Sequence, residues 1–353
     1  MKKRRSKKPK IELPDSILSI IFSKLGLKDL VKTSTLSKQW RHELGLRTDL
    51  NFDLHNMFEL DCNTIQELQK SLPLFKGFQS EFVTRLDQFM LHYQGAMIRS
   101  VRVNFPLDTK HSVVIDRVIS KGIAKGAERI ELLFSYETID PIPTLDQIEP
   151  HKFSFTLLSH TDCLTYLHLQ NCHLVAPKDL SGLKNLRTLV LQLVDVHQNL
   201  LQGLFSNCIH LVNFTLDQCD FKSDLKIISS TLFHLNIVNC GDQVGWARNI
   251  DVIASNLSSI EYSFNSDYPL HIMKIEADML SKFSYRGNQI YRYGSVENRE
   301  YYAFGFSGLK NVTSIVFDGL RDCPQRFVMP LLFFECLQLE DVTFKNCKQI
   351  SDM

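Results

Sequence analysis

Residues 164–172 read LTYLHLQNC, and residues 186–194 read LRTLVLQLV. Both stretches place leucine at the first, fourth and sixth positions, which gives the pattern L-x-x-L-x-L. In the second half of this pattern, apolar and variable residues alternate at the period of a strand that buries one face. The two stretches therefore predict two short strands of the same kind.

The same pattern, with other apolar residues in place of some leucines, occurs ten times along the chain. Seven of the nine intervals between successive starts lie between 21 and 29 residues, which is the period of leucine-rich repeats. One repeat cannot bury its apolar face alone, so such repeats stack on their neighbours. The sequence predicts a right-handed α/β leucine-rich-repeat solenoid over residues 98–353, with its short strands on the concave side. The patterns start at Ile98, Ala127, Leu164, Leu186, Leu211, Leu232, Leu257, Leu280, Val312 and Leu339.

A cysteine stands eight residues after the start of four patterns, and an asparagine precedes it in three of them. The Asn-Cys pairs predict a repeated turn in which the asparagine amide bonds to neighbouring backbone groups. The nine cysteines are an odd number, and no C-x-x-C pair or secretory signal is visible, so we expect reduced thiols. We expect small buried side chains with no metal or redox role at Cys172, Cys219, Cys240 and Cys347.

The variable positions of the predicted strands carry mixed polar and aromatic side chains. Such a surface is suited to recognising a protein or a small ligand, although the same residue types are expected on any solvated sheet. Our candidates for substrate contact are Tyr166, His168, Arg187, Asn213 and His234.

Residues 11–43 read IELPDSILSIIFSKLGLKDLVKTSTLSKQWRHE. Pro14 suits the first turn of a helix, and the apolar residues after it recur at helical spacing until Gly26. A Ser/Thr run at 33–35 predicts that the rest breaks into two short helices. Three short helices bury too little surface to be stable alone. They either dock on the rest of the protein or leave apolar residues for a partner.

This N-terminal segment resembles an F-box. The resemblance rests on Leu13-Pro14, Ile17-Leu18, Ile21, Leu25, Leu30 and Trp40-Arg41. The body resembles plant F-box/leucine-rich-repeat proteins in residues 126–130, GAERI, and in residues 164–172 followed by Pro177 and by 182–186, GLKNL.

The resemblance implies a non-catalytic substrate-recognition subunit of an SCF-type, cullin-based E3 ubiquitin ligase. The F-box would bind the adaptor protein that bridges to cullin, and the repeats would hold an unknown substrate protein. The alternatives are an adaptor-bound scaffold without ubiquitination activity and a nuclear binding protein. The residues that the resemblance implies for adaptor binding are Leu13, Pro14, Ile17, Leu18, Ile21, Leu25, Leu36 and Trp40.

The ends of the chain and the segment between the two modules complete the domain prediction. We expect a disordered basic tail over 1–10, the F-box over 11–50, and a helical linker and N-terminal cap over 51–97. Within the linker, residues 78–92 read as an amphipathic helix that Gln94-Gly95 ends. After the linker, residues 115–122 read as the helix of the first repeat. The last pattern has no obvious cap, which predicts a truncated chain or a cap supplied by a partner.

Charge and motifs narrow the function further. Seven of the first ten residues are basic, and the chain has a formal net charge of +1, so the remainder carries about 1 − 7 = −6. This argues against a nucleic-acid surface over the whole body, while the tail fits an import signal or a solubilising segment. We expect the nucleus or the cytoplasm as the location, with no membrane span. No nucleotide loop, HExxH or GxSxG motif is present, so we expect no catalytic residue, cofactor or metal.

Overall fold

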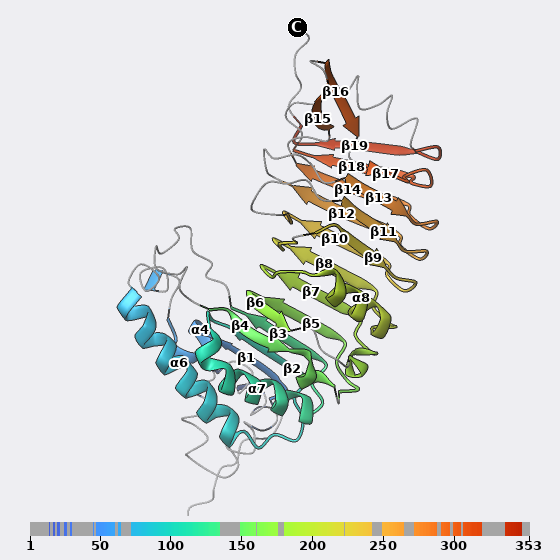
Figure 1. Ribbon diagram of the computed structural model, residues 1–353. Helices are drawn as coiled ribbons and strands as arrows, with labels where there is room; N and C mark the ends of the chain where they lie inside the picture. Colours follow the sequence, from blue (N-terminus) through green and yellow to red (C-terminus); the bar gives the residue numbers. More distant parts are fainter. Residues whose placement is uncertain are drawn as a thin grey trace, which may run out of the picture.

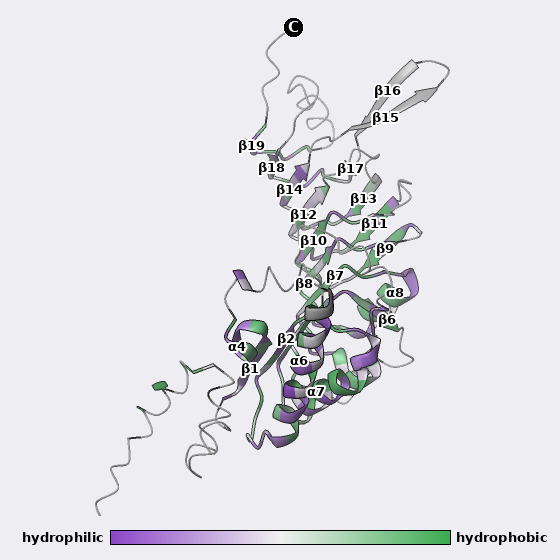
Figure 2. Ribbon diagram, turned by 90° about the vertical axis from the view of Figure 1, so that its left-hand side faces the viewer, coloured by the Kyte–Doolittle hydropathy of each residue, from purple (hydrophilic) through white to green (hydrophobic). Residues whose placement is uncertain are grey.

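The computed structural model shows an elongated stack of short strands, from β1 near one end to β19 near the other (Figure 1). The structure describes residues 47–60, 72–134, 149–159, 161–175, 180–221, 223–241, 249–264, 272–287, 291–296, 299–304, 306–319 and 336–347, and also 14, 17, 20–21, 25–26, 29, 45 and 63–64. Figure 2 shows hydrophobic and hydrophilic residues sharing single strands and helices, as expected when each element has one face in the core.

Eleven strands form one parallel sheet, and they stand in the sheet in the order in which they occur along the chain. All ten predicted patterns are confirmed, because the fourth and sixth residues of each lie in one of these strands. The strands are β1 (Asp49–Asp53), β2 (Ser100–Asn104), β3 (Arg129–Leu133), β5 (Tyr166–Gln170), β7 (Thr188–Gln192), β8 (Asn213–Asp217), β10 (His234–Val238), β12 (Ser259–Phe264), β14 (Lys282–Gly287), β18 (Ser314–Asp318) and β19 (Asp341–Lys345).

The sheet begins one strand earlier than the sequence predicts. β1 pairs in parallel with β2, and Leu50 and Phe52 are buried at the fourth and sixth positions of the pattern. The first position holds Arg47, which hides the pattern from a search for apolar residues. The sheet therefore starts inside the range predicted for the F-box, and well before the predicted boundary at residue 98.

Behind the sheet, the chain returns through helices in the N-terminal half and mainly through strands in the C-terminal half (Figure 1). The helical returns are α6 (Leu72–His92), α7 (Ser112–Ala124) and α8 (Gln198–Asn207). The extended returns form a four-stranded parallel sheet of β9 (Leu225–Ile228), β11 (Asn249–Ile253), β13 (Ile272–Glu276) and β17 (Phe306–Ser307).

Local composition explains this change from helix to strand. The α8 sequence, QNLLQGLFSN, is rich in leucine and glutamine, which lose little freedom in a helix. β9, β11 and β13 read LKII, NIDVI and IMKIE, and their β-branched residues favour extended backbone. The predicted α/β architecture thus describes the N-terminal repeats, while several later repeats have strands on both sides.

The smaller elements fill the connections. They are α4 (Leu54–Phe58), the 3-10 turns η1 (Thr109–His111), η3 (Phe155–Leu158) and η4 (Ser181–Leu183), the parallel pair β4 (His151–Ser154) with β6 (Cys172–Val175), and the antiparallel hairpin of β15 (Tyr291–Val296) with β16 (Arg299–Phe304).

The helix predicted over 78–92 is α6, which starts six residues earlier, at Leu72. It connects β1 to β2 and packs beside α7, with Phe82, Leu86 and Met90 buried. α6 is therefore the crossover of the first repeat, and not a cap beyond the first strand. The helix predicted over 115–122 lies within α7. Among the described helices, none is long and apolar enough to cross a membrane.

The predicted Asn-Cys turns are confirmed in the backbone. Asn171, Asn239 and Asn346 each follow a strand of the main sheet and have φ between 47° and 53°. Asparagine tolerates this left-handed conformation better than most residues. The Asn171 amide also donates to the carbonyl of Phe134, at 3.0 Å, which links its turn to the preceding repeat.

The cysteines after these turns lie against the core. Cys172, Cys219 and Cys240 are buried, and Cys347 is half-buried. Cys219 Sγ donates to the carbonyl of Leu191, at 3.2 Å, so a thiol serves as a small donor between repeats. Burial raises the pKa of the Cys172 and Cys240 thiols above the ordinary range, which opposes thiolate chemistry. Within the described residues, no three His, Cys, Asp or Glu side chains group as a metal would require.

Candidate binding face

The main sheet has one face that turns away from the core. In most of its strands the second and fourth residues are buried, while the first, third and fifth remain partly exposed. We call the side formed by the first, third and fifth residues the open face. Three predicted contact residues share one row of it: Tyr166 and Asn213 each align with Thr188, and Asn213 aligns with His234.

The remaining two predicted contacts lie close to this row. His168 is the third residue of β5, so it lies on the same face as Tyr166. Arg187 precedes β7, and its backbone N–H donates to the carbonyl of Thr165, at 2.8 Å. All five predicted residues are thus on the open face or at its border. Whether they contact a substrate stays a prediction.

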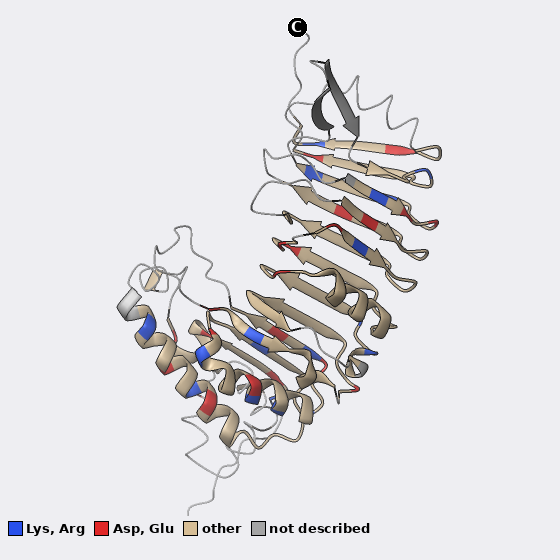
Figure 3. Cartoon of the chain, viewed as in Figure 1, with Lys and Arg blue, Asp and Glu red and all other residues tan. Residues whose placement is uncertain are grey.

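Three charged residues on β2 and β3 surround Tyr166. The Arg129 guanidinium carbon lies 3.5 Å from the centre of the Tyr166 ring, close enough for a cation–π contact. Arg129 Nε lies 2.5 Å from Glu131 Oε1, and Arg102 Nε lies 3.9 Å from Glu131 Oε2. We call Arg102, Arg129, Glu131, Tyr166 and Arg187 the arginine–tyrosine patch. The charged residues of β2 and β3 are visible on the lower part of the sheet in Figure 3.

Burial within the patch is uneven. The Glu131 side chain is only 11% exposed, whereas those of Arg102 and Arg129 are each 44% exposed. The Glu131 carboxylate therefore lies at the base of the patch, and the guanidinium groups of Arg102 and Arg129 reach solvent. Burial also raises the pKa of Tyr166, so its hydroxyl keeps its proton near neutral pH.

A chain of hydrogen bonds leads from the patch across the next strands. His168 Nε2 lies 3.2 Å from Gln192 Oε1, and Gln192 Nε2 donates to Asp217 Oδ2 at 2.8 Å. Because an amide oxygen only accepts, Nε2 of His168 carries the proton. Burial lowers the pKa of His168, so its imidazole is neutral near pH 7. The chain fixes the orientation of a neutral histidine beside two arginines.

Asn213 and His234 form a separate polar region. Asn213 Nδ2 donates to Thr188 Oγ1 at 3.2 Å, and His234 Nδ1 lies 2.6 Å from Ser259 Oγ. Both residues bond along the row to the neighbouring strand. The predicted contact set therefore divides between the patch and this second region.

Our sequence prediction missed Arg102, Arg129 and Glu131. They occupy strand positions equivalent to those of Tyr166 and His168: Arg129 aligns with Tyr166, and Glu131 aligns with both His168 and Arg102. The sequence contained the information needed to find them, since β2 and β3 were both predicted from the patterns at Ile98 and Ala127. Applying the register of β5 to β2 and β3 would have identified all three residues.

The structure describes half of the residues predicted to bind an adaptor. Leu13, Leu18, Leu36 and Trp40 lie outside the described residues. Pro14 is exposed, Ile17 is 44% exposed, and Ile21 and Leu25 are half-buried. Arg47 Nη1 donates to the carbonyl of Leu25, at 3.1 Å, which links this segment to the start of the sheet.

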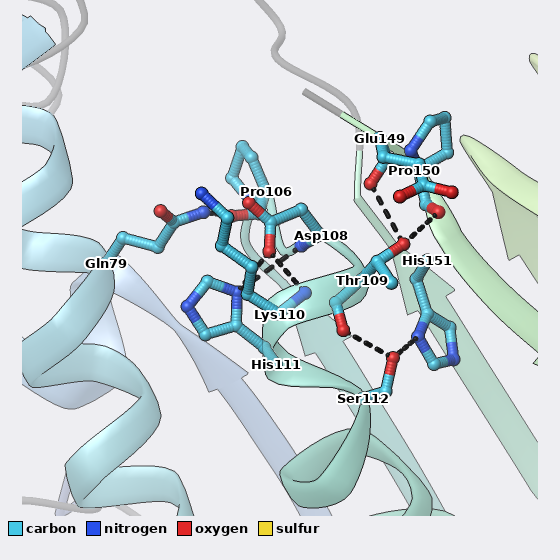
Figure 4. A network of polar contacts seen from close by, with 10 residues as sticks. All are labelled: Gln79, Pro106, Asp108, Thr109, Lys110, His111, Ser112, Glu149, Pro150 and His151. Atoms are coloured by element: carbon cyan, nitrogen blue, oxygen red, sulfur yellow. Dashed lines mark hydrogen bonds and ion pairs between the residues drawn. The ribbon is translucent and has the colours of Figure 1, made fainter. Parts of the chain in front are cut away.

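Ser112, His151 and Asp116 are the described group most similar to a catalytic triad (Figure 4 shows the first two). Ser112 Oγ lies 3.2 Å from His151 Nδ1, and Asp116 Oδ1 lies 3.9 Å from His151 Nε2. However, Ser112 Oγ donates its proton to the carbonyl of Thr109, at 2.7 Å, and His151 is fully buried. The serine is therefore not poised as a nucleophile, and the group instead ties the start of α7 to β4.

Comparison with known families agrees with this architecture. A family model described as "At1g61320/AtMIF1, LRR domain" matches residues 90–297, which is more than half of the chain. The F-box domain model matches residues 11–43. The chain belongs to the plant F-box/leucine-rich-repeat family. The F-box match lies inside the range predicted for this module, and the other match begins near the predicted first repeat.

Several Arabidopsis thaliana proteins are similar to this F-box/leucine-rich-repeat protein. "F-box protein At1g80960" is 26% identical over 71% of this chain and 47% of its own length. "Putative FBD-associated F-box protein At1g61330" is 25% identical over 73% of this chain and 56% of its own length. "F-box/LRR-repeat protein At3g26922" is 30% identical over 58% of each protein. The chain thus spans about half the length of these curated relatives. No solved structure matches it.

Proposed function

We propose that this protein is a substrate-recognition subunit of an SCF-type, cullin-based E3 ubiquitin ligase. The observation that carries the proposal is the F-box match at residues 11–43, joined in one chain to a repeat sheet with an open polar face. The F-box binds an SKP1-type adaptor, and the open face binds a substrate protein. The protein carries no chemistry of its own, because holding a substrate beside the ubiquitin-conjugating enzyme raises the effective concentration of its lysines.

Exposed apolar residues in the N-terminal segment support the adaptor-binding part of the proposal. Ile17 and Ile20 are 44% and 63% exposed, although both are large hydrophobic residues. An apolar helix face of this kind is what a partner groove requires. The link between Arg47 and the carbonyl of Leu25 supports a fixed approach of the F-box to the sheet.

Co-purification with an SKP1-type adaptor tests this proposal. Wild-type protein should retain the adaptor, and the double variant Leu13→Ala/Pro14→Ala should lose most of it. A matched control is Lys282→Gln on β14, which should bind the adaptor as wild type does. If wild type retains no adaptor, or the double variant retains as much, the proposed role is wrong.

Reconstituted ubiquitination separates a ligase receptor from an adaptor-bound scaffold. Proteins captured by the full chain while the proteasome is blocked provide candidate substrates. A receptor transfers ubiquitin to at least one of them in the presence of adaptor, cullin and ubiquitin-conjugating enzyme. A protein that binds adaptor but supports no transfer is a scaffold.

The basic tail at residues 1–10 supports a nuclear location as part of this proposal, because a dense Lys/Arg cluster is the usual form of an import signal. A fluorescent fusion should accumulate in the nucleus and lose that accumulation when residues 1–10 are deleted. An unchanged distribution after the deletion contradicts this part.

A further inference from the structure

The arginine–tyrosine patch holds more positive charge than its own carboxylate neutralises. Arg102 and Arg129 share Glu131, and one carboxylate balances only one of two guanidinium charges. Arg187, whose backbone N–H bonds to the carbonyl of Thr165 next to Tyr166 in sequence, is exposed and has no ion pair among the described residues. Glu128, at the same position two repeats earlier, is also exposed, and its carbonyl accepts from the Tyr166 N–H. Three arginines against Glu131 and Glu128 leave about one net positive charge around one half-buried aromatic ring.

The rest of the open face next to the patch has the opposite sign. Residues 212–217, 233–238 and 258–263, which include β8 and β10 and most of β12, contain Asp217 and Glu261 and no lysine or arginine. Beyond β2 on the other side, β1 carries Asp49 and Asp53, and Asp49 is paired with Arg99. On these neighbouring strands only the patch is positive, and the next cationic side chains on the open face are Lys282 and Arg286 of β14.

The geometry points to an acidic segment of the substrate protein, rich in Asp and Glu side chains, as the occupant of the arginine–tyrosine patch. This inference rests on the proposed function only for the identity of the partner as a substrate. Charge complementarity selects carboxylates, because a guanidinium group presents a planar fork that a carboxylate binds through two parallel hydrogen bonds. The contact with the Tyr166 ring restrains Arg129, which reduces the freedom that this arginine must lose on binding.

Arginine and tyrosine are also the residue types that most often dominate interface energetics. The neutral His168, oriented through Gln192, adds a polar group at the edge of the patch without adding a charge that would compete for the ligand. Glu131 occupies the guanidinium groups in the free protein, so it is an internal competitor of an acidic ligand.

Peptide binding to the purified full chain tests the inference by fluorescence anisotropy. The probe is a fluorescein-labelled peptide of alternating Glu and Ser, and the matched peptide carries Gln in place of Glu. The acidic peptide should bind and the Gln peptide should not. The double variant Arg102→Gln/Arg129→Gln should weaken binding by about tenfold or more, since it removes two charge-assisted contacts. Arg187→Gln should weaken binding by about threefold.

Glu131→Gln gives a result of the opposite sign. Glutamine keeps an acceptor oxygen for Arg129 Nε but removes the competing charge, so the acidic peptide should bind about threefold more tightly. Because a misfolded variant loses affinity, a gain cannot come from damage to the fold. Arg187 has no ion pair among the described residues, so its variant is a second test with little risk to stability.

The matched control is Lys282→Gln/Arg286→Gln on β14, which removes two positive charges from the same face and breaks one ion pair, that of Arg286 with Asp318. It should change affinity by less than about twofold. Equal losses in the control and the patch variants, equal binding of the Gln peptide, or weaker binding by Glu131→Gln would each overturn the inference. Adaptor retention is measured separately, so a failure here leaves the proposed function standing.

Discussion

At the residue scale, one backbone conformation repeats through the solenoid at positions of different chemistry. The residue after the strand has φ near +50° at Asn171, Leu193, Gln218, Asn239 and Asn346, and φ of +82° at Gly319. Its N–H also reaches the next strand, as Leu193 N–H does to the carbonyl of Asp217, at 2.9 Å. Glycine suits this conformation because it has no Cβ, and asparagine because its short polar side chain can bond the local backbone, which leucine cannot do.

Leu193→Asn should therefore stabilise the protein. Leu193 is 38% exposed, so the substitution removes less apolar burial than it would at a core leucine. The expected gain in the free energy of unfolding is about 1 kcal/mol, measured by urea denaturation. The reciprocal change Asn171→Leu should destabilise by more, because it also removes the hydrogen bond to the carbonyl of Phe134. A loss of stability in Leu193→Asn would show that strain at this turn is not significant.

His151 is the residue at which stability should depend on pH. It is fully buried, and burial lowers its pKa from 6.5 to about 4. The folded state therefore resists protonation that the unfolded state accepts below pH 6.5. Its contribution is fully present above pH 6.5 and is lost as pH falls toward 4, on the order of 3 kcal/mol in total.

His151→Asn removes this titration while keeping an N–H donor near Ser112 Oγ. The variant should be less stable than wild type at pH 7.5, because its smaller side chain leaves space in the core. The difference in free energy of unfolding should shrink steadily between pH 6.5 and 4. A difference that stays constant across this range would contradict the assignment of the pH dependence to His151.

At the element scale, the strands were predictable and the returns were not. A strand of the main sheet is set mainly by two apolar positions at a fixed spacing. Each of the ten strands that the pattern predicts is therefore present in the structure. β1 was not predicted, because Arg47 occupies the first position of its pattern, where the other repeats have an apolar residue. The returns depend on packing behind the sheet, and short segments such as LKII in β9 carry no period that separates strand from helix.

The change from helical to extended returns occurs between α8 and β9, where the side chain of Gln198 bonds to the free edge of β9. Gln198 Nε2 donates to the carbonyl of Lys226, at 3.0 Å, and Lys226 N–H donates to Gln198 Oε1 at 2.7 Å. β9 is the last strand on its side of the four-stranded sheet. One glutamine amide therefore makes the two hydrogen bonds that a further strand would supply.

Gln198→Ala should cost about 1–2 kcal/mol in the free energy of unfolding, since two hydrogen bonds to the edge strand are lost. Hydrogen exchange at the Lys226 amide should accelerate in the same variant. Gln202→Ala, on the exposed side of α8, is the matched control and should change neither quantity. Unchanged exchange at Lys226 in Gln198→Ala would mean that the edge is protected by other means.

At the scale of the whole molecule, the chain joins two modules, and the roles that we propose for them are separable. The repeats of L-x-x-L-x-L and the F-box motif were sufficient to predict the family, because both consist of apolar residues at fixed spacing. The open face was predicted only in part. Its strand register was correct, but the cation–π contact of Arg129 with Tyr166 depends on pairing between strands that are 37 residues apart in the sequence.

Adaptor affinity is the quantity that tests the central claim most directly. An SKP1-type adaptor is titrated into the full chain by calorimetry, with wild type, Leu13→Ala/Pro14→Ala and Arg102→Gln/Arg129→Gln compared. We predict tight binding by wild type and by the patch variant, and a loss of about tenfold or more in the F-box variant. Absence of binding by wild type, or equal affinity in the F-box variant, would contradict it.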